Sequence, residues 1–200
     1  YLYFVSIREK TFADKLFNPI DNLIYKICRI NKDEEMNWKE YVFSIIIVNA
    51  VMVFTGYVIL RAQGFLFLNP NKIDGMEQSL SFNTIISFMT NTNLQDYSGE
   101  SGLSHLSQMI VIIFMMFTSA ATGFAAALAF MRGIIGKKGM GNFFVDITRI
   151  ITRVLLPFSI VIGILLVSQG VPQTLSGTKT VTTIEGKMQD IAMGPVAALE

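Results

Sequence analysis

One stretch of the chain carries four small polar residues in a row: Thr90, Asn91, Thr92 and Asn93. Small side chains allow backbone carbonyls to point at a common axis, while Thr and Asn side chains can hold the strand from behind by hydrogen bonds. The tetrapeptide follows a short apolar segment, Met76–Met89, and precedes a charged turn with several glycines. Irregular backbone of this kind occurs at membrane depth only where it is buried in protein or lines a watery cavity. The pattern predicts an ion-selectivity filter, in which carbonyl oxygens replace the water of a cation.

The same tetrapeptide, taken alone, also fits an ordinary connecting loop. Its position between a short helix and a returning span favours the filter. Two acidic residues, Asp96 and Glu100, follow it closely. We expect them at the extracytoplasmic mouth, where they either concentrate cations or are simply solvated loop charges.

The composition is that of a membrane protein. The 200 residues are 52% hydrophobic and 16% charged, against about 25% charged in soluble domains, and the mean hydropathy is +0.49. A net charge of +1 without a dense basic cluster gives no reason to expect a nucleic-acid partner. One cysteine, Cys28, and one histidine, His105, exclude an internal disulfide and a metal site rich in either residue.

Long uncharged segments predict three membrane spans. Val42–Leu60 has 19 residues without a charge and follows Trp38 and Tyr41, which suit an aromatic belt. Ser101–Met131 is the second span, with Gly123 as a point where it can bend. A span needs about 20 apolar residues, so the 14 residues of Met76–Met89, about 21 Å of helix, are too few.

The third span is Val154–Val167 together with Ile150 and Ile151, and Pro157 is expected to kink it near its start. The basic residues then fix the topology. If Met76–Met89 returns to its own side, 12 of the 16 Lys and Arg residues lie on one face; if it crosses, the split is 9 to 7. Only the first arrangement satisfies the positive-inside rule. A re-entrant helix and an interfacial helix both remain open.

These segments divide the chain into five parts. Residues 1–7 are expected to be the tail of a truncated first transmembrane helix, and residues 8–40 a cytoplasmic loop. The amphipathic part of this loop either lies beside the membrane or docks a partner. Residues 41–131 form a helix–pore loop–helix repeat, and residues 132–149 a cytoplasmic connection. Residues 150–200 start a second repeat, with a span, an extracytoplasmic loop and the beginning of a pore helix at Ala192–Glu200.

Three separated motifs resemble one protein family. They are SFMTNTNLQDYSGE (Ser87–Glu100), DEEMNWKEY (Asp33–Tyr41) and MGPVA (Met193–Ala197). Together they closely resemble the KdpA family, the potassium-binding subunits of bacterial Kdp potassium-transporting ATPases. The whole chain is similar to roughly the first third of that family, with the motifs in the same order.

The resemblance implies an all-α polytopic membrane protein of the potassium transporter superfamily, built from four helix–pore helix–helix repeats around one pore. Thr90–Asn93 would be the first of four filter strands, binding potassium from the extracytoplasmic side through backbone carbonyls. Gln95 would lie beside the filter. Leu94 stands where the family commonly has an aromatic residue, which affects side-chain packing there rather than the role. Three of the four strands are missing, so the ion site cannot be whole in this chain.

The resemblance also implies partners and a location. The partners would be a P-type ATPase catalytic subunit, small accessory subunits of the Kdp complex and the lipid bilayer of a bacterial or archaeal plasma membrane. Potassium would be the substrate, with no organic cofactor. The chain carries no phosphate loop or phosphorylation motif, so we expect no catalytic chemistry in it. The alternatives are a self-sufficient potassium channel or symporter of the same superfamily, and a membrane scaffold without an ion site. The flanking motifs favour the pump subunit.

Overall fold

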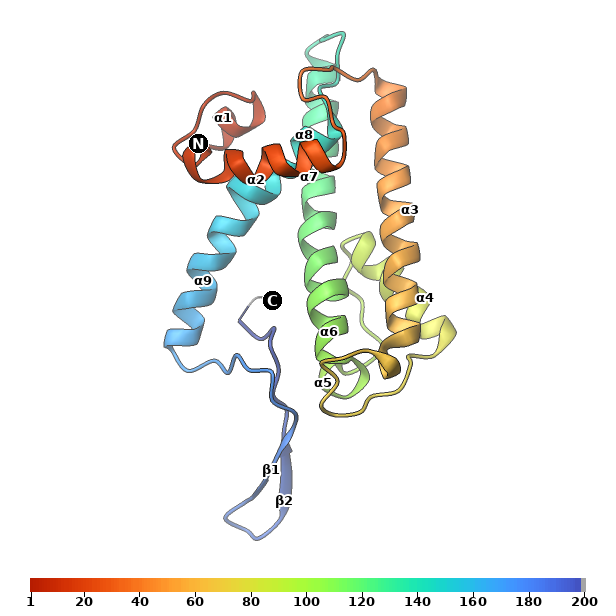
Figure 1. Cartoon of the computed structure of the whole chain (residues 1–200), viewed down its shortest axis with the longest axis vertical. Coiled ribbons are helices and arrows are strands. Elements are labelled where there is room, and N and C mark those ends of the chain that lie inside the picture. Colours follow the sequence, from red (N-terminus) through yellow and green to blue (C-terminus); the bar gives the residue numbers. More distant parts are fainter. Residues whose placement is uncertain (199–200) are drawn as a thin grey trace. The chain divides into compact units, whose positions relative to one another are not determined.

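The computed structural model describes residues 1–198, which form two compact units (Figure 1). The first unit combines residues 1–51 with 117–159, and the second combines 52–116 with the described residues from 160 onward. The chain is mostly helical. Its helices in sequence order are α1 (Leu2–Ser6), α2 (Asp14–Ile27), α3 (Trp38–Ala62), α4 (Gln78–Met89), α5 (Gly99–Gly102), α6 (His105–Ser107), α7 (Phe114–Ile134), α8 (Phe143–Ile150) and α9 (Leu156–Ser168).

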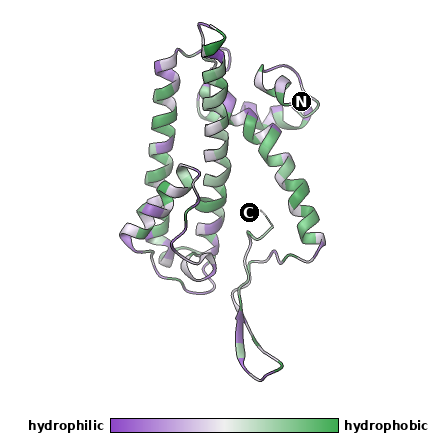
Figure 2. Ribbon diagram, turned by 180° about the vertical axis from the view of Figure 1, so that it is seen from behind, coloured by the Kyte–Doolittle hydropathy of each residue, from purple (hydrophilic) through white to green (hydrophobic). Residues whose placement is uncertain are grey.

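Three continuous helical stretches are long and apolar enough to cross a membrane. They are Trp38–Phe65, His105–Ile134 and Phe143–Ser168, and they confirm the three predicted spans and the helical membrane class. Hydrophobic residues dominate these stretches (Figure 2). In the most apolar 18 residues of the first stretch only 6% are buried inside the protein, as expected for a helix that contacts lipid.

The second span begins later than the sequence predicted. It starts at His105, not Ser101, because the short helix α5 ends and the backbone of Leu103 and Ser104 is extended. Ser104 then caps the new helix, since its Oγ accepts the Ser107 N–H at 3.2 Å. Hydropathy did not reveal the break because the uncharged run continues through it.

The irregular part of this span also lies elsewhere than expected. A π-helical segment, Gln108–Ile113, precedes α7, whereas Gly123 lies inside the uninterrupted helix α7. A Cβ placed on Gly123 would have no atom within 4 Å, so this glycine is not needed for a close approach within the described residues.

The third span is irregular just before Pro157, where a second π-helical segment, Ile151–Leu155, precedes α9; the kink expected at Pro157 stays a prediction. Proline has no N–H, so the carbonyl of Arg153, four residues earlier, loses its helical donor. The Tyr1 hydroxyl donates to that carbonyl at 2.8 Å instead. The helix leading into this span is capped by Asn142, whose side chain accepts the N–H groups of the first turn of α8.

The polar tail after the third span contains an element that the sequence did not predict. Strands β1 (Lys179–Thr182) and β2 (Met188–Ile191) form an antiparallel hairpin, with Lys179 opposite Ile191. Several β-branched residues in the first strand favour extended backbone, and Gly186 adopts the positive φ of the turn. This region was expected to be a plain polar loop.

The expected start of a pore helix at Ala192–Glu200 is wrong for the described residues 192–198, whose backbone is irregular and contains no helix; residues 199–200 lie outside the described part. The backbone of this segment bonds instead to the preceding loop. Thr174 N–H donates to the Gly194 carbonyl at 3.0 Å, and the Gln173 side chain bonds both the Pro195 carbonyl and the Ala198 N–H. Forming the first turn of a helix is unfavourable, because it fixes several residues for a single hydrogen bond. The bonds to the preceding loop are made here instead.

The second unit has one apolar core, and α4 packs into it. Ile85 and Phe88 of α4 are buried with residues of α3 and of the second span. Gly56 permits the contact, since a Cβ there would lie 2.8 Å from Ile85 Cδ1. The Met76 N–H donates to the Leu60 carbonyl at 3.1 Å, which fastens the start of the α4 segment to the end of α3.

Candidate ion-selectivity filter

Helix α4 begins at a strong cap and ends at the tetrapeptide. The Glu77 carboxylate accepts the Leu80 N–H at 2.9 Å and the Ser79 hydroxyl at 2.6 Å. These bonds, the Ser79 hydroxyl above all, lower the pKa of Glu77 to about 2. At the other end the helix stops at Met89 and Thr90. The C-terminal end of a helix carries a partial negative charge that favours cations, and residues 90–93 follow it directly.

The backbone of the tetrapeptide turns back onto this helix end. All four of its N–H groups donate to carbonyls in the last turn of α4: Thr90 to Ile86 at 2.9 Å, Asn91 to Phe88 at 3.2 Å, and Thr92 and Asn93 to Ser87 at 3.0 and 3.3 Å. All the backbone N–H groups of Thr90–Asn93 are therefore hydrogen-bonded within the protein.

The backbone angles alternate in sign along the same residues. Thr90 has φ −83°, while Asn91 and Asn93 have φ of 57° and 51° and Thr92 between them is not left-handed. Asparagine tolerates this conformation better than most residues. Alternation between right- and left-handed residues gathers successive N–H groups on one side, which leaves the carbonyls on the other. Among the described residues, none donates a hydrogen bond to the carbonyl of Thr90, Thr92 or Asn93.

Hydroxyl groups hold this shape from the helix side. Thr92 Oγ1 donates to the Ser87 carbonyl at 3.1 Å and lies 3.0 Å from Thr90 Oγ1. Ser87 Oγ donates to the Leu94 carbonyl at 2.9 Å. Sequence reasoning missed Ser87 as a residue of the site. The sequence feature that could have identified Ser87 is its position in the last turn of a predicted helix, directly before the irregular strand.

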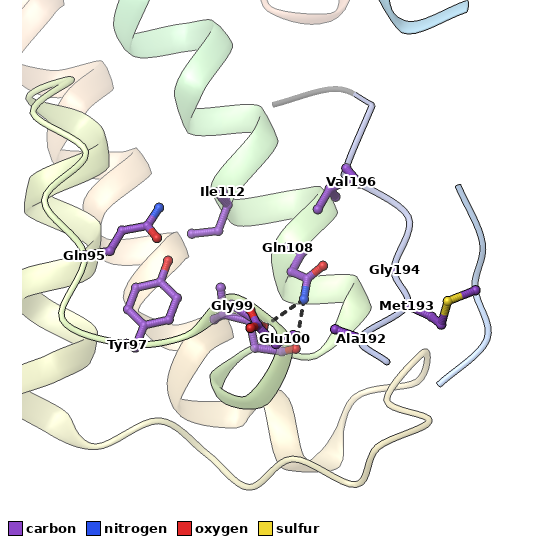
Figure 3. Close-up of a pocket in the computed structure, with 12 residues that line it drawn as sticks. Gln95, Tyr97, Gly99, Glu100, Gln108, Ile112, Ala192, Met193, Gly194 and Val196 are labelled. Carbon is purple, nitrogen blue, oxygen red and sulfur yellow. Dashed lines mark hydrogen bonds between the residues drawn. The ribbon is translucent and has the colours of Figure 1, made fainter. Parts of the chain in front are cut away.

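Gln95 and Glu100 line a common cavity of about 250 Å³ (Figure 3). Tyr97 lies beside them, and Gln108 faces them from the second span. Residues 90–93 do not line this cavity, and Asp96 is exposed outside it. Hydrogen bonds from its own backbone N–H and from Ser98 lower the pKa of Glu100, so its carboxylate stays charged at the cavity wall.

Two buried glutamine side chains fix the loop that carries Gln95 and Glu100. Gln108 Nε2 donates to the carbonyls of Gly99 and Leu103 at 3.0 and 3.2 Å (Figure 3). Gln63 is fully buried; its Nε2 donates to the carbonyls of Asp74 and Gly102, both at 2.9 Å, and its Oε1 accepts the Ser104 N–H at 3.1 Å. Neither residue was predicted as part of the site. Each stands beside an apolar run, which is not a specific signal.

The site offers oxygen donors from backbone, amide and hydroxyl groups. Within residues 1–198, no group of three or more His, Cys, Asp or Glu side chains lies close enough to hold a metal ion.

Comparison with known proteins identifies the family. The model of the potassium-transporting ATPase A subunit family matches residues 1–200. Curated relatives named potassium-transporting ATPase potassium-binding subunit are 60% identical in Clostridium acetobutylicum and 52% identical in Geobacillus kaustophilus, over the whole of this chain. The chain spans 36% of the length of these relatives. It therefore belongs to the KdpA family of potassium-transporting ATPase A subunits.

Proposed function

We propose that residues 90–93 form one strand of a potassium-selective filter that binds the ion through backbone carbonyls from the extracytoplasmic side. The observation that supports this most is the return of all four N–H groups to the end of α4. A strand whose amide side is fully bonded has only its carbonyl side to offer to a ligand, and carbonyl oxygens attract cations.

The proposal also accounts for the position of α4. A short helix that ends at the strand directs its negative dipole end toward the ion. By the likeness to the family, four such strands complete the ring, so this strand contributes about a quarter of the ligands. A cation that leaves water must regain most of its coordination, and the activity therefore belongs to the complete protein.

Gln95 and Glu100 have separate roles in this proposal. Gln95 lies beside the filter as a neutral side chain, so that no fixed charge competes with the ion. Glu100, whose pKa is lowered by its hydrogen bonds, stays ionised and attracts cations toward the mouth together with the exposed Asp96.

The chain acts in this proposal as a non-hydrolytic subunit of a potassium pump. Its relatives are named as potassium-binding subunits of a potassium-transporting ATPase. The ATP-hydrolysing partner would be a P-type catalytic subunit, accompanied by small accessory subunits, in the plasma membrane of a bacterium or archaeon. Transport that continues without ATP would favour the alternative of a self-sufficient channel or symporter.

The test uses the full-length protein in its assembled complex. A ligand that binds the native state raises its stability, by about 2.7 kcal/mol at a hundredfold excess over Kd. Potassium should therefore raise Tm relative to sodium at equal ionic strength. Gln95→Arg should remove this difference, because a fixed positive charge about 6 Å from the ion repels it by roughly 3 kcal/mol at an effective dielectric near 20, about a hundredfold in affinity.

The matched control is Gln189→Arg, the same change on the exposed strand β2, which should keep the potassium-dependent Tm. If Gln95→Arg kept it as well, the filter assignment would fall and residues 90–93 would be a connecting loop of a scaffold.

A further inference from the structure

Helix α2 in the first unit buries one stripe of side chains. Ala13, Phe17, Asp21 and Tyr25 are all buried, and their spacing of four residues places them along one side of a helix. Three of the four are hydrophobic residues and one is a carboxylate, so this side is fixed by both packing and charge.

The partner of that carboxylate is Arg153, which is fully buried in the π-helical segment before Pro157. Its guanidinium bonds Asp21 and, at 2.8 Å, Asp14, and it donates to the Asn18 side chain at 2.7 Å. Both acidic residues of α2 are thus turned toward the protein and neutralised there. The helix cannot rotate without separating a buried charge pair, which is strongly unfavourable.

This orientation leaves a second apolar stripe uncovered. Leu16, Ile20, Leu23 and Ile27 are 68%, 47%, 57% and 71% exposed, and their spacing of four, three and four residues places them on one face. At about 100° per residue, Lys15 and Lys26 lie on the same edge of this stripe. The outward side of α2 therefore offers hydrophobic residues bordered by cations, because its acids face inward.

The placement of α2 points to what covers this face. Within the first unit, Figure 1 shows α2 lying across the direction of α3 up to residue 51 and of α7 from residue 117, not alongside them. Trp38, at the start of α3, is 61% exposed, and Lys39 Nζ lies 5.6 Å from the centre of its ring. An exposed Trp at the end of a membrane span marks the level of the lipid headgroups. A helix that lies crosswise to the spans has the orientation of a helix in the plane of the interface.

We propose that α2 is an interfacial helix whose outer stripe inserts into the headgroup–acyl boundary of the bilayer, with Lys15 and Lys26 against the phosphates of anionic lipids. The ion pairs of Arg153 with Asp14 and Asp21 fix the rotation of α2, so that its outer stripe faces away from the protein. An anionic membrane surface attracts such basic residues and an apolar face of this size adds to the binding.

The test measures the surroundings of single spin labels in the full-length protein, assembled with its complex in vesicles of phosphatidylglycerol and phosphatidylcholine. Cys28, which is exposed, is first replaced by serine. Labels are introduced by Ile20→Cys on the outer stripe and by Asn22→Cys on the exposed polar side as the matched control. The ratio of oxygen to nickel-reagent collisions should be several-fold higher at residue 20 than at residue 22.

Two other results would contradict insertion. Equal ratios at both positions would mean that the stripe faces water, and low access to both reagents at residue 20 would mean that another protein subunit covers it. A separate measurement tests the role of anionic lipids. In vesicles of phosphatidylcholine alone, the ratio of oxygen to nickel-reagent collisions at residue 20 should be lower. Lys15→Gln with Lys26→Gln should abolish that dependence, and an unchanged dependence would refute the role of the lysines.

Discussion

Replacing Thr92 by valine tests whether the hydroxyl contacts behind the strand set ion selectivity. Valine has nearly the same shape as threonine and leaves the backbone bond from residue 92 to Ser87 in place. The change removes only the hydroxyl, which donates to the Ser87 carbonyl at 3.1 Å and contacts Thr90 Oγ1 at 3.0 Å and Ser87 Oγ at 3.3 Å. Helix α4 keeps its buried residues, so the fold should be unaffected.

The expected size follows from the two shorter of these contacts. A hydrogen bond contributes about 0.5–1.5 kcal/mol to stability, so losing both costs about 1–3 kcal/mol. Each 1.4 kcal/mol is tenfold in an equilibrium constant, and the ordered form of the strand becomes about 5- to 140-fold less favoured. Because Thr92 is exposed in this part of the protein, we expect the lower end of that range.

The assay is ATP hydrolysis by the assembled complex of the full-length protein, measured against potassium and rubidium concentration. Thr92→Val should weaken apparent potassium affinity by about fivefold and reduce discrimination against rubidium, because a looser strand adapts to the larger ion. Ser101→Ala is the control, since the Ser101 hydroxyl lies on the surface with a marginal contact of 3.5 Å. Ser107 would be a poor control because it is fully buried and bonded to Ser104. Wild-type affinity and selectivity in Thr92→Val would refute the reasoning that the hydroxyls hold the strand.

Three further predictions follow from the same structure. Asn93→Gly should keep potassium-stimulated hydrolysis, whereas Asn93→Val should weaken it, since a β-branched residue at φ 51° costs about 1–2 kcal/mol; equal activity of the two variants would argue against the left-handed strand. In a Cys28→Ser background, a cysteine replacing Lys137 should react with an impermeant reagent only from the cytoplasm and one replacing Lys179 only from outside, and labelling of both from one side would disprove the topology. The Glu77 cap has a folded pKa of about 2, below the ordinary value, so its stabilisation is complete above about pH 4.5 and is lost as the pH falls through 2. The difference in hydrogen-exchange protection of the first turn of α4 between wild type and Glu77→Ala should therefore be as large at pH 5 as at pH 7, and a difference already lost at pH 5 would show that the carboxylate is not the cap.

The sequence predicted the helices that consist of a long run of hydrophobic residues. The three spans and the short helix α4 were visible because each is a run of hydrophobic residues between charges or turns. The break at Leu103 and Ser104 was not visible, because both residues continue an uncharged run. The irregular backbone at 192–198 is hydrogen-bonded to Gln173, about twenty residues away, and no local pattern encodes such a contact.

The same distinction applies to the candidate site. Thr90–Asn93 could be singled out because small polar residues between two apolar segments are unusual. Gln63 and Gln108 could not, since their importance lies in which carbonyls they reach after folding. Likewise, the inward direction of Asp14 and Asp21 on α2 follows from Arg153, more than 130 positions later.

The return of residues 90–94 onto the end of α4 has a consequence for the order of folding. The hydrogen bonds that make this return join residues no more than seven apart. Loops of about ten residues close within 10–100 ns, whereas a ribosome adds about 5–20 residues per second. The strand can thus take its shape almost as soon as it is synthesised. In the proposed four-strand filter, assembly would then bring together strands that are already folded, and its slow step would be the docking of helices rather than the shaping of each strand.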